Sequence, residues 1–213
     1  MAYGMSGKVF HAPFIHLNAG FNFVAVTERS KKQAALDYPG VISYDTIDEL
    51  IADENIDLII INTPNYTHYD YAKKCLLAGK HILVEKPFTP TVAQAKELFA
   101  LAKQVGKKAL VYHNRRFDSG FNITKQVIES GKLGKLVDVH FKYDRYRAEI
   151  GHKFFKEDPS FEAHGLAYDL GPHLLDQAIS LFGKPERFHK ILANHRENSK
   201  VDDYFFIHLA YPN

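Results

Sequence analysis

The segment that decides the fold spans residues 57–87 and reads DLIIINTPNYTHYDYAKKCLLAGKHILVEKP. It opens with a short, mostly apolar run from Asp57 to Ile61 and closes with a second one from His81 to Val84. A longer amphipathic stretch that ends at Gly79 lies between them. Short apolar runs are typical of strands buried on both faces, and the stretch between them has helical spacing. The segment therefore predicts a parallel β-α-β unit.

The same alternation extends from about residue 21 to residue 112. Further strands are predicted at residues 23–26, 41–42 and 109–112, and helices at 30–36, 46–52, 66–78 and 91–105. Thr46 followed by Glu49 is a capping-box pattern that supports the start of one of these helices. The alternation predicts an α/β domain with a doubly wound parallel sheet, in which ligands bind beyond the carboxyl ends of the strands.

After Arg116 the pattern changes. A helix is predicted at residues 121–130, followed by long alternating strands at residues 136–147, 187–195 and 204–211. Alternation of apolar with polar residues is typical of an antiparallel sheet with one exposed face. We therefore predict two domains, residues 1–117 and an α+β domain at 118–213.

Composition excludes several classes of protein. The chain has 213 residues, of which 46% are hydrophobic and 24% charged, so it has enough apolar material for a folded core. Its longest apolar run is far shorter than the roughly 20 residues that cross a membrane. A net charge of +2, spread along the chain, gives no basis for nucleic-acid binding. A single cysteine, Cys75, is consistent with a reducing, cytoplasmic location.

Residues 2–8, AYGMSGK, have the spacing of the glycine turn G-x-G-x-x-G, with alanine at the first position. Such a turn lets the backbone approach a pyrophosphate at the start of the following helix, although a turn without a ligand is the plainer alternative. Glu28 favours the nucleotide, because it lies about 20 residues further on at a strand end, where an acid binds ribose hydroxyls. The candidate residues of the turn are Gly4, Met5, Ser6 and Gly7.

The choice between NAD and NADP stays open at this point. A carboxylate at Glu28 repels a 2′-phosphate and favours NAD. Arg29, Ser30 and Lys31 follow it directly, and they could instead bind that phosphate.

Glu85-Lys86-Pro87 follows the predicted strand at residues 81–84. The proline holds Lys86 extended or supplies a cis bond, so that the lysine stands at the strand end. In an apolar cleft a lysine can donate a proton or anchor a developing negative charge. A surface Lys-Pro turn is the alternative interpretation.

Residues 165–176 read GLAYDLGPHLLD, and Pro172 must lie in the first turn of any helix there. We therefore expect a helix that begins near Asp169 and carries Asp169, His173 and Asp176 along one face. His173 can act as a general base, with Asp169 orienting it. A helix-capping aspartate and a hydrogen-bonded core histidine are the alternatives. No cysteine accompanies these residues, and we expect no metal site.

Two substrate-contact candidates lie further from any motif. Arg115 follows a predicted parallel strand, a position that favours binding of an anion or hydroxyl group. The alternative interpretation is that Arg115 and Arg116 are both solvated surface residues. Tyr146 belongs to a cluster of tyrosine and arginine at residues 143–147 that we expect to line one sheet face and to reach a substrate.

Together these motifs resemble the family of glucose-fructose oxidoreductase, inositol dehydrogenase and the rhizopine-catabolism proteins, abbreviated Gfo/Idh/MocA. The resemblance rests on AYGMSGKVFHAPF (2–14), TPNYTHYDYAKKCLLAGKHILVEKP (63–87), VYHNRRFDSGF (111–121) and YDLGPHLLDQAISLFG (168–183). The sequences of the last two segments are most similar to those of NADP-using scyllo-inositol dehydrogenases and their unassigned relatives. The resemblance implies a Rossmann domain followed by an α+β domain whose open sheet mediates dimer or tetramer contacts.

The resemblance also implies reversible oxidation of a secondary alcohol on a cyclic polyol or sugar, with NAD or NADP as cofactor. It assigns catalysis to Lys86, Asp169 and His173, and substrate contact to Arg115. The residues that it places along the cofactor are Thr63, Pro64, Asn65, His68, Glu85, Lys86 and Asn114.

The chain departs from the family pattern at its ends. It starts inside the glycine turn, without residues for a first parallel strand, and it stops at Tyr211-Pro212-Asn213. We therefore expect a fragment of a longer protein. The alternatives to a working dehydrogenase are a dinucleotide-binding regulatory protein without turnover and an inactive truncated product.

Overall fold

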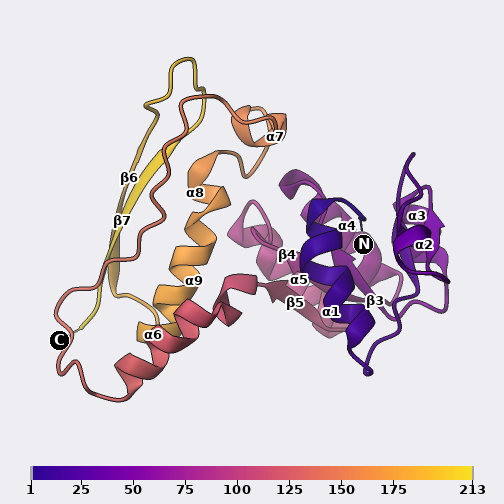
Figure 1. Ribbon diagram of the computed structural model, residues 1–213, viewed down its shortest axis with the longest axis horizontal. Helices are drawn as coiled ribbons and strands as arrows, with labels where there is room; N and C mark the ends of the chain where they lie inside the picture. The colour runs from indigo at the N-terminus through magenta and orange to yellow at the C-terminus, as the bar shows by residue number, and fades with distance from the viewer. Residues whose placement is uncertain (1, 213) are drawn as a thin grey trace. The chain divides into compact units, whose positions relative to one another are not determined.

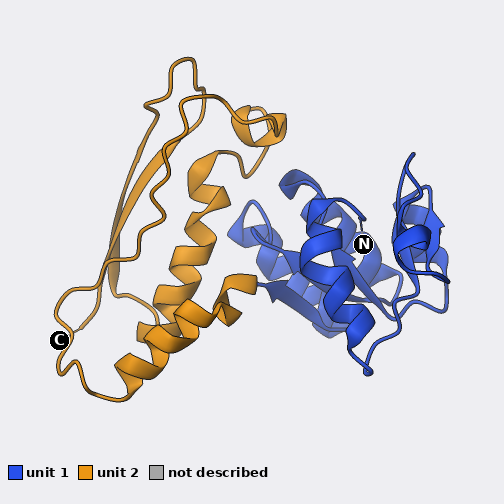
Figure 2. Cartoon of the chain, in the orientation of Figure 1, with its two compact units in different colours: residues 1–112 blue, residues 113–213 orange. Residues whose placement is uncertain are grey.

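The structure is a computed structural model that describes residues 2–212 of the chain. The chain divides into two compact units, residues 1–112 and 113–213, drawn in blue and orange in Figure 2. Within the described range, no helix has the length and apolar character needed to cross a membrane.

The first unit alternates strands and helices, as the sequence predicts (Figure 1). Its strands pair in parallel, β1 with β2, and β4 with both β3 and β5. The predicted parallel α/β architecture is confirmed, with the sheet in two pieces. The elements are η1 (Gly7–His11), α1 (Ala12–Leu17), β1 (Ala25–Thr27), α2 (Ala34–Asp37), β2 (Ile42–Tyr44), α3 (Ile47–Ala52), β3 (Leu58–Ile61), η2 (Asn65–Thr67), α4 (His68–Leu77), β4 (His81–Glu85), α5 (Val92–Gln104) and β5 (Ala109–Tyr112).

Alternate residues of β3 face two separate apolar clusters. Ile59 packs in the cluster that contains Leu76 of α4 and Leu98 of α5. Its neighbour Ile60 packs in the cluster that contains Ala12 of α1. Helices therefore cover both faces of the sheet, which is why its strands read as continuous apolar runs.

The predicted helix boundaries hold where a capping signal is present. Thr46 and Thr91 each form a complete capping box, with Glu49 and Gln94 as the respective partners. Gly79 follows α4 with a φ of +73°, a conformation that glycine adopts without strain.

The start of α2 differs from the sequence prediction. The expected helix runs over residues 30–36, but α2 begins at Ala34. The carboxylate of Glu28 accepts hydrogen bonds from the backbone N–H groups of Gln33 and Ala34, at 3.0 and 3.1 Å. These bonds fix the first turn of the helix there and leave residues 29–32 as an exposed loop.

The second unit combines helices with one antiparallel strand pair. In that pair, His189 of β6 lies opposite His208 of β7. Phe121, Ala178 and Val201 are buried within the unit. Its elements are η3 (Asn114–Phe117), α6 (Ser119–Glu129), α7 (Phe154–Glu157), α8 (Gly165–Asp169), α9 (Gly171–Phe182), β6 (Arg187–Ala193) and β7 (Tyr204–Ala210).

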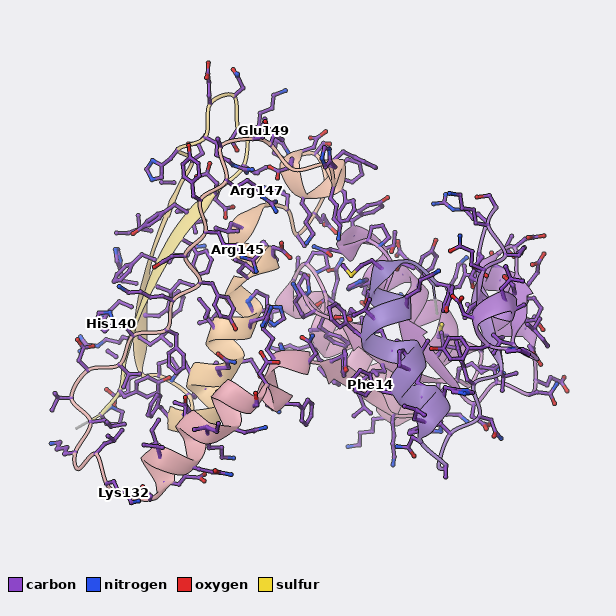
Figure 3. All side chains as sticks on the ribbon, in the orientation of Figure 1. Phe14, Lys132, His140, Arg145, Arg147 and Glu149 are labelled. Atoms are coloured by element: carbon purple, nitrogen blue, oxygen red, sulfur yellow. The ribbon has the colours of Figure 1, made fainter. Side chains whose placement is uncertain are left out.

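The predicted strand at residues 136–147 is wrong, because this stretch has no regular secondary structure. Figure 3 labels His140, Arg145 and Arg147 along it. The residue alternation suits a sheet face, but a strand also needs a hydrogen-bonded neighbour. Within residues 2–212, β6 and β7 pair with each other, and residues 136–147 join neither of them.

Candidate functional site

The glycine turn of the first unit is tight on one side and open on the other. Ala2 forms a parallel bridge with Thr27, and the Asn62 side chain bonds both its backbone groups, at 2.8 and 2.9 Å. A Cβ at Gly7 would lie 2.2 Å from the Ala2 carbonyl oxygen, so only glycine fits there. A Cβ at Gly4 would meet nothing within 4 Å, so the exposed backbone there is open to a close ligand.

The helix start after this turn is suited to an anion. The side chain of Ser6, the N-cap residue, makes no capping hydrogen bond in the described chain and instead donates to Oε1 of Glu85 at 3.1 Å. Uncapped N–H groups at a helix start attract phosphate, so the turn fits a dinucleotide pyrophosphate. The same Ser6 bond ties the turn directly to the end of β4.

Glu85 lies in a buried network at the end of β4. Nε2 of His11 donates a hydrogen bond to its Oε1 across 2.8 Å. Burial by itself would raise the pKa of Glu85, but His11, Ser6 and Lys86 together hold that pKa below its ordinary value. The carboxylate is therefore held ionised and fixed immediately before Lys86.

His68 connects the loops that follow β3 and β4. It is 1% exposed, with Nδ1 2.8 Å from the carbonyl oxygen of Pro87 and Nε2 2.9 Å from that of Thr63. Burial lowers the pKa of His68, although both carbonyl contacts oppose the shift. The neutral ring has a single N–H and so donates to one carbonyl at a time. His68 thus holds two strand ends together at the carboxyl edge.

Lys86 is half-buried, and its bond to Pro87 is cis, which selects one of the two alternatives left open by the sequence. Thr63 and Pro64 lie at the neighbouring strand end, where Thr67 Oγ1 is 2.6 Å from Thr63 Oγ1 and donates to the Pro64 carbonyl at 2.7 Å. Asn65 is buried at the start of η2. The predicted cofactor residues of the first unit after β3 and β4 therefore gather at one sheet edge.

Glu28 has partners within the chain that the sequence did not indicate. Its carboxylate bonds the start of α2 and also accepts from the Ser43 hydroxyl at 2.8 Å. The neighbouring Arg29 is exposed.

Asn114 and Arg115 belong to η3 of the second unit. The Oδ1 atom of Asn114 is buried and has no hydrogen-bond partner among the described residues. Arg115 donates to Asp118 at 3.0 Å, and its guanidinium lies 5.2 Å from the ring centre of Tyr143. A pocket of about 430 Å³ opens beside it, lined by Arg115, Asp118, Ser119, Gly120, Phe121, Thr124, Phe141, Tyr143 and Gln177.

Tyr146 is 96% exposed, in contrast to Tyr143. Both were expected on one face of a regular strand, but the stretch that carries them is irregular. The structure therefore places Tyr143, rather than Tyr146, beside Arg115 and the pocket.

Asp169 and His173 lie on two consecutive helices, so the expectation of one helix beginning near Asp169 is wrong. Asp169 is the last residue of α8, and α9 begins at Gly171. Pro172 lies in the first turn of α9, as predicted. Because proline has no N–H to bond the carbonyl four residues earlier, the helical hydrogen-bond series is interrupted at Leu170. Asp169 accepts a hydrogen bond from Lys156 at 2.5 Å, and His173 is buried.

Asp176, one turn beyond His173, holds η3 against α9. Both oxygens of its carboxylate accept from Arg116, with Nε–H donating across 3.0 Å, and His113 lies 3.8 Å away. The bidentate pair fixes the loop that carries Asn114 and Arg115.

Comparison with known families accounts for both units. Residues 2–113 match the profile described as an oxidoreductase family with an NAD-binding Rossmann fold, and residues 121–213 match the Gfo/Idh/MocA C-terminal domain. The chain belongs to the Gfo/Idh/MocA oxidoreductase family. The resemblance found in the sequence is therefore confirmed.

Relatives of this Gfo/Idh/MocA chain match nearly all of it. The uncharacterized oxidoreductase YdgJ of Escherichia coli is 41% identical over 100% of the chain and 61% of its own length. The scyllo-inositol 2-dehydrogenase (NADP(+)) IolW of Bacillus subtilis is 33% identical over 99% and 58%. The crystal structure of an oxidoreductase from Bacillus cereus is 38% identical, with a TM-score of 0.87 over 100% and 60%. The chain thus spans about 60% of the length of these relatives.

Sequence reasoning missed three contacts of this Gfo/Idh/MocA chain. His11 has no motif spacing that indicates a partner, but it bonds Glu85. Lys156, the partner of Asp169, lies in a short helix without any motif. Asn62 holds the glycine turn, and its place directly after a parallel strand was the signal that could have revealed it.

Proposed function

We propose that this chain is the cofactor-binding and catalytic part of an NAD(P)-dependent oxidoreductase. The reaction is hydride transfer between the nicotinamide and a secondary alcohol of a cyclic polyol or sugar. The observation that carries the proposal is the hydrogen bond from Ser6 to Glu85. It joins an open, phosphate-compatible glycine turn to the strand end that presents Lys86, as hydride transfer beside a bound nucleotide requires.

The proposed cofactor site uses residues at the carboxyl edge of the first unit. Gly4 provides open backbone, and the helix start after the turn provides N–H groups for the pyrophosphate. Glu85 and His68 keep the neighbouring loops in place. The residues that we propose to contact the cofactor are Gly4, Met5, Ser6, Gly7, Arg29, Thr63, Pro64, Asn65, His68, Glu85, Lys86 and Asn114.

In the proposed chemistry one side chain takes a proton and two others position the reacting groups. The bound nicotinamide supplies hydride acceptance and donation. His173 takes the proton of the substrate hydroxyl, as an imidazole can at neutral pH. Lys86 donates a hydrogen bond to the reacting oxygen, and Asp169, held by Lys156, fixes the substrate hydroxyl in register.

Arg115 is the proposed substrate contact of the second unit. Its guanidinium faces a pocket that combines aromatic rings with amide and hydroxyl groups, among them Tyr143 and Gln177. Rings and hydrogen-bonding groups together suit the apolar and hydroxylated faces of a polyol.

The whole protein is proposed to act as a dimer or tetramer through the sheet of the second unit. Ile191 of β6 lies opposite Phe206 of β7, and both are exposed apolar side chains, a surface that favours a protein contact. Sedimentation of the full protein would reveal the oligomer, and a monomer at all concentrations would contradict it.

The test measures binding and turnover separately. NADPH and NADH are titrated by fluorescence, and turnover is measured with a panel of inositols and aldoses. We expect His173→Ala to abolish turnover while cofactor affinity changes less than about twofold, since the imidazole acts on the substrate proton. His152→Ala, which removes an exposed histidine outside the sheet and the proposed site, is the control and should retain full activity. Unaltered turnover in His173→Ala would disprove the catalytic assignment, and a protein that binds cofactor without any turnover would support the regulatory alternative.

A further inference from the structure

A short basic loop, residues 29–32, lies beside the glycine turn of the first unit. Thr27, two residues before the loop, bridges Ala2 of the turn. Lys8, which follows the turn, donates to Oε1 of Gln33 at 2.6 Å, directly after the loop. Both ends of the loop are therefore tied to the turn. A nucleotide whose pyrophosphate lies on the turn brings its adenosine ribose to this loop.

The acid that would bind the ribose hydroxyls is engaged within the protein. The Glu28 carboxylate accepts three hydrogen bonds, from the N–H groups of Gln33 and Ala34 and from the Ser43 hydroxyl. Glu28 is 9% exposed, so almost none of its surface is left for a ribose. The partial positive charge of these donors also offsets the repulsion that an acid here exerts on a phosphate.

The loop keeps two cations for a ligand. Lys32 is used internally, donating to the Glu28 carbonyl at 2.9 Å and pairing with Asp45 at 2.6 Å. Arg29 and Lys31 are exposed, and within residues 2–212 neither side chain has a hydrogen-bond or ion-pair partner. The nearby acids Asp37 and Asp45 are held by other side chains.

We infer that this chain binds NADP(H) in preference to NAD(H), with Arg29, Ser30 and Lys31 holding the 2′-phosphate of the adenosine ribose. The inference rests on the proposed function, because it assumes that the glycine turn holds a dinucleotide. Arg29 offers a planar fork of donors, Lys31 a mobile charge and Ser30 a hydroxyl, a set that matches the oxygens of a phosphate monoester. A ribose without the phosphate offers these cations no charge to bind.

The test is a fluorescence titration of the chain with NADPH and NADH at one low ionic strength. We expect NADPH to bind at least about tenfold more tightly, since charge-assisted hydrogen bonds to phosphate are strong. Arg29→Ser and Lys31→Ser should each weaken NADPH binding about tenfold and change NADH binding less than about twofold. Lys96→Ser, which removes an exposed lysine from α5, is the matched control and should change neither.

A competition experiment isolates the phosphate from the rest of the cofactor. Adenosine 2′,5′-bisphosphate should displace NADPH at lower concentration than 5′-AMP, and added salt should narrow the difference. Equal or tighter binding of NADH, or NADPH binding that the two loop variants leave unchanged, would overturn the inference and leave the proposed function in place. Absence of saturable binding by either nucleotide would overturn the proposed function and the inference with it.

Discussion

Nε2 of His11 lies 2.8 Å from Oε1 of Glu85, and both side chains are largely buried, 2% and 13% exposed. This contact links the helical segment after the glycine turn to the strand end that carries Lys86. Because Ser6 bonds the same carboxylate oxygen, one acid orders both halves of the proposed cofactor site.

Glu85→Gln is expected to destabilise the first unit by about 1–3 kcal/mol at neutral pH, because a buried charged hydrogen bond is lost. The pKa of Glu85 is lower in the fold than its ordinary value of 4.5. Its contribution is therefore complete above pH 4.5 and is lost as the pH falls below that value. Urea unfolding at pH 7 and pH 4 measures both effects.

The control for this prediction is Glu97→Gln. Glu97 pairs with Lys73 at a similar distance, 2.7 Å, but both side chains are exposed. Solvent screens such pairs, so the change in unfolding free energy should be much smaller than for Glu85. Equal effects of the two variants would contradict the assigned role of Glu85.

His68→Leu is expected to cost about 1–3 kcal/mol, because the Thr63 and Pro87 carbonyls lose their shared donor inside the protein. Burial lowers the pKa of His68, so the fold favours the neutral ring and loses stability as the pH falls below the ordinary value of 6.5. The variant should lack this loss between about pH 6.5 and 5. Urea unfolding midpoints across that range provide the measurement, with His152→Leu as an exposed control. An unchanged pH profile in His68→Leu would show that another group causes the loss.

The sequence predicted the fold best where local signals and burial agree. The buried runs of β3 and β4 and the capping box at Thr46 each predicted their element from neighbouring residues, and the structure adds a second capping box at Thr91. The prediction of a strand at residues 136–147 was wrong, because the alternation of apolar and polar residues indicates which residues are exposed but not whether a neighbouring strand is present.

The candidate site was predictable to the extent that strand ends reveal it. Glu85 and Lys86 were found because they lie at the carboxyl end of a parallel strand. Contacts between distant segments were not, since no local spacing connects His11 with Glu85 or Lys156 with Asp169. For the same reason the sequence predicted that Glu28 binds ribose hydroxyls, and it could not show that the start of α2 and Ser43 donate hydrogen bonds to the Glu28 carboxylate.

Glu28→Gln is expected to destabilise the first unit by about 1–3 kcal/mol, because an amide has one acceptor oxygen for donors that now share two. Ser43→Ala removes a single one of these donors and should cost less, about 1 kcal/mol. Thermal or urea unfolding of the two variants gives the comparison. A Glu28→Gln protein as stable as the unmodified chain would mean that the carboxylate does not fix the start of α2.

Arg116→Ala is expected to weaken substrate binding more than cofactor binding. Asp176 is 8% exposed on its side chain, and removing Arg116 leaves its carboxylate without its bidentate partner, at a cost of about 1–3 kcal/mol. The loop that carries Asn114 and Arg115 then loses one of its contacts with α9 but keeps the hydrogen bond from Gln177 to the Arg115 carbonyl, at 3.2 Å. KM should therefore rise by a larger factor than the NADPH dissociation constant, because Asn114 is one of many proposed cofactor contacts.

Arg116→Lys and Lys125→Ala complete this experiment. Lysine keeps the charge but cannot form two parallel hydrogen bonds, so Arg116→Lys should restore only part of the loss. Lys125 forms an exposed pair with Glu129 on α6, where screening leaves little to lose, and its variant should behave as the unmodified protein does. Full recovery by lysine would show that charge alone matters at this position, and a KM unaffected by either Arg116 variant would separate the loop from substrate binding.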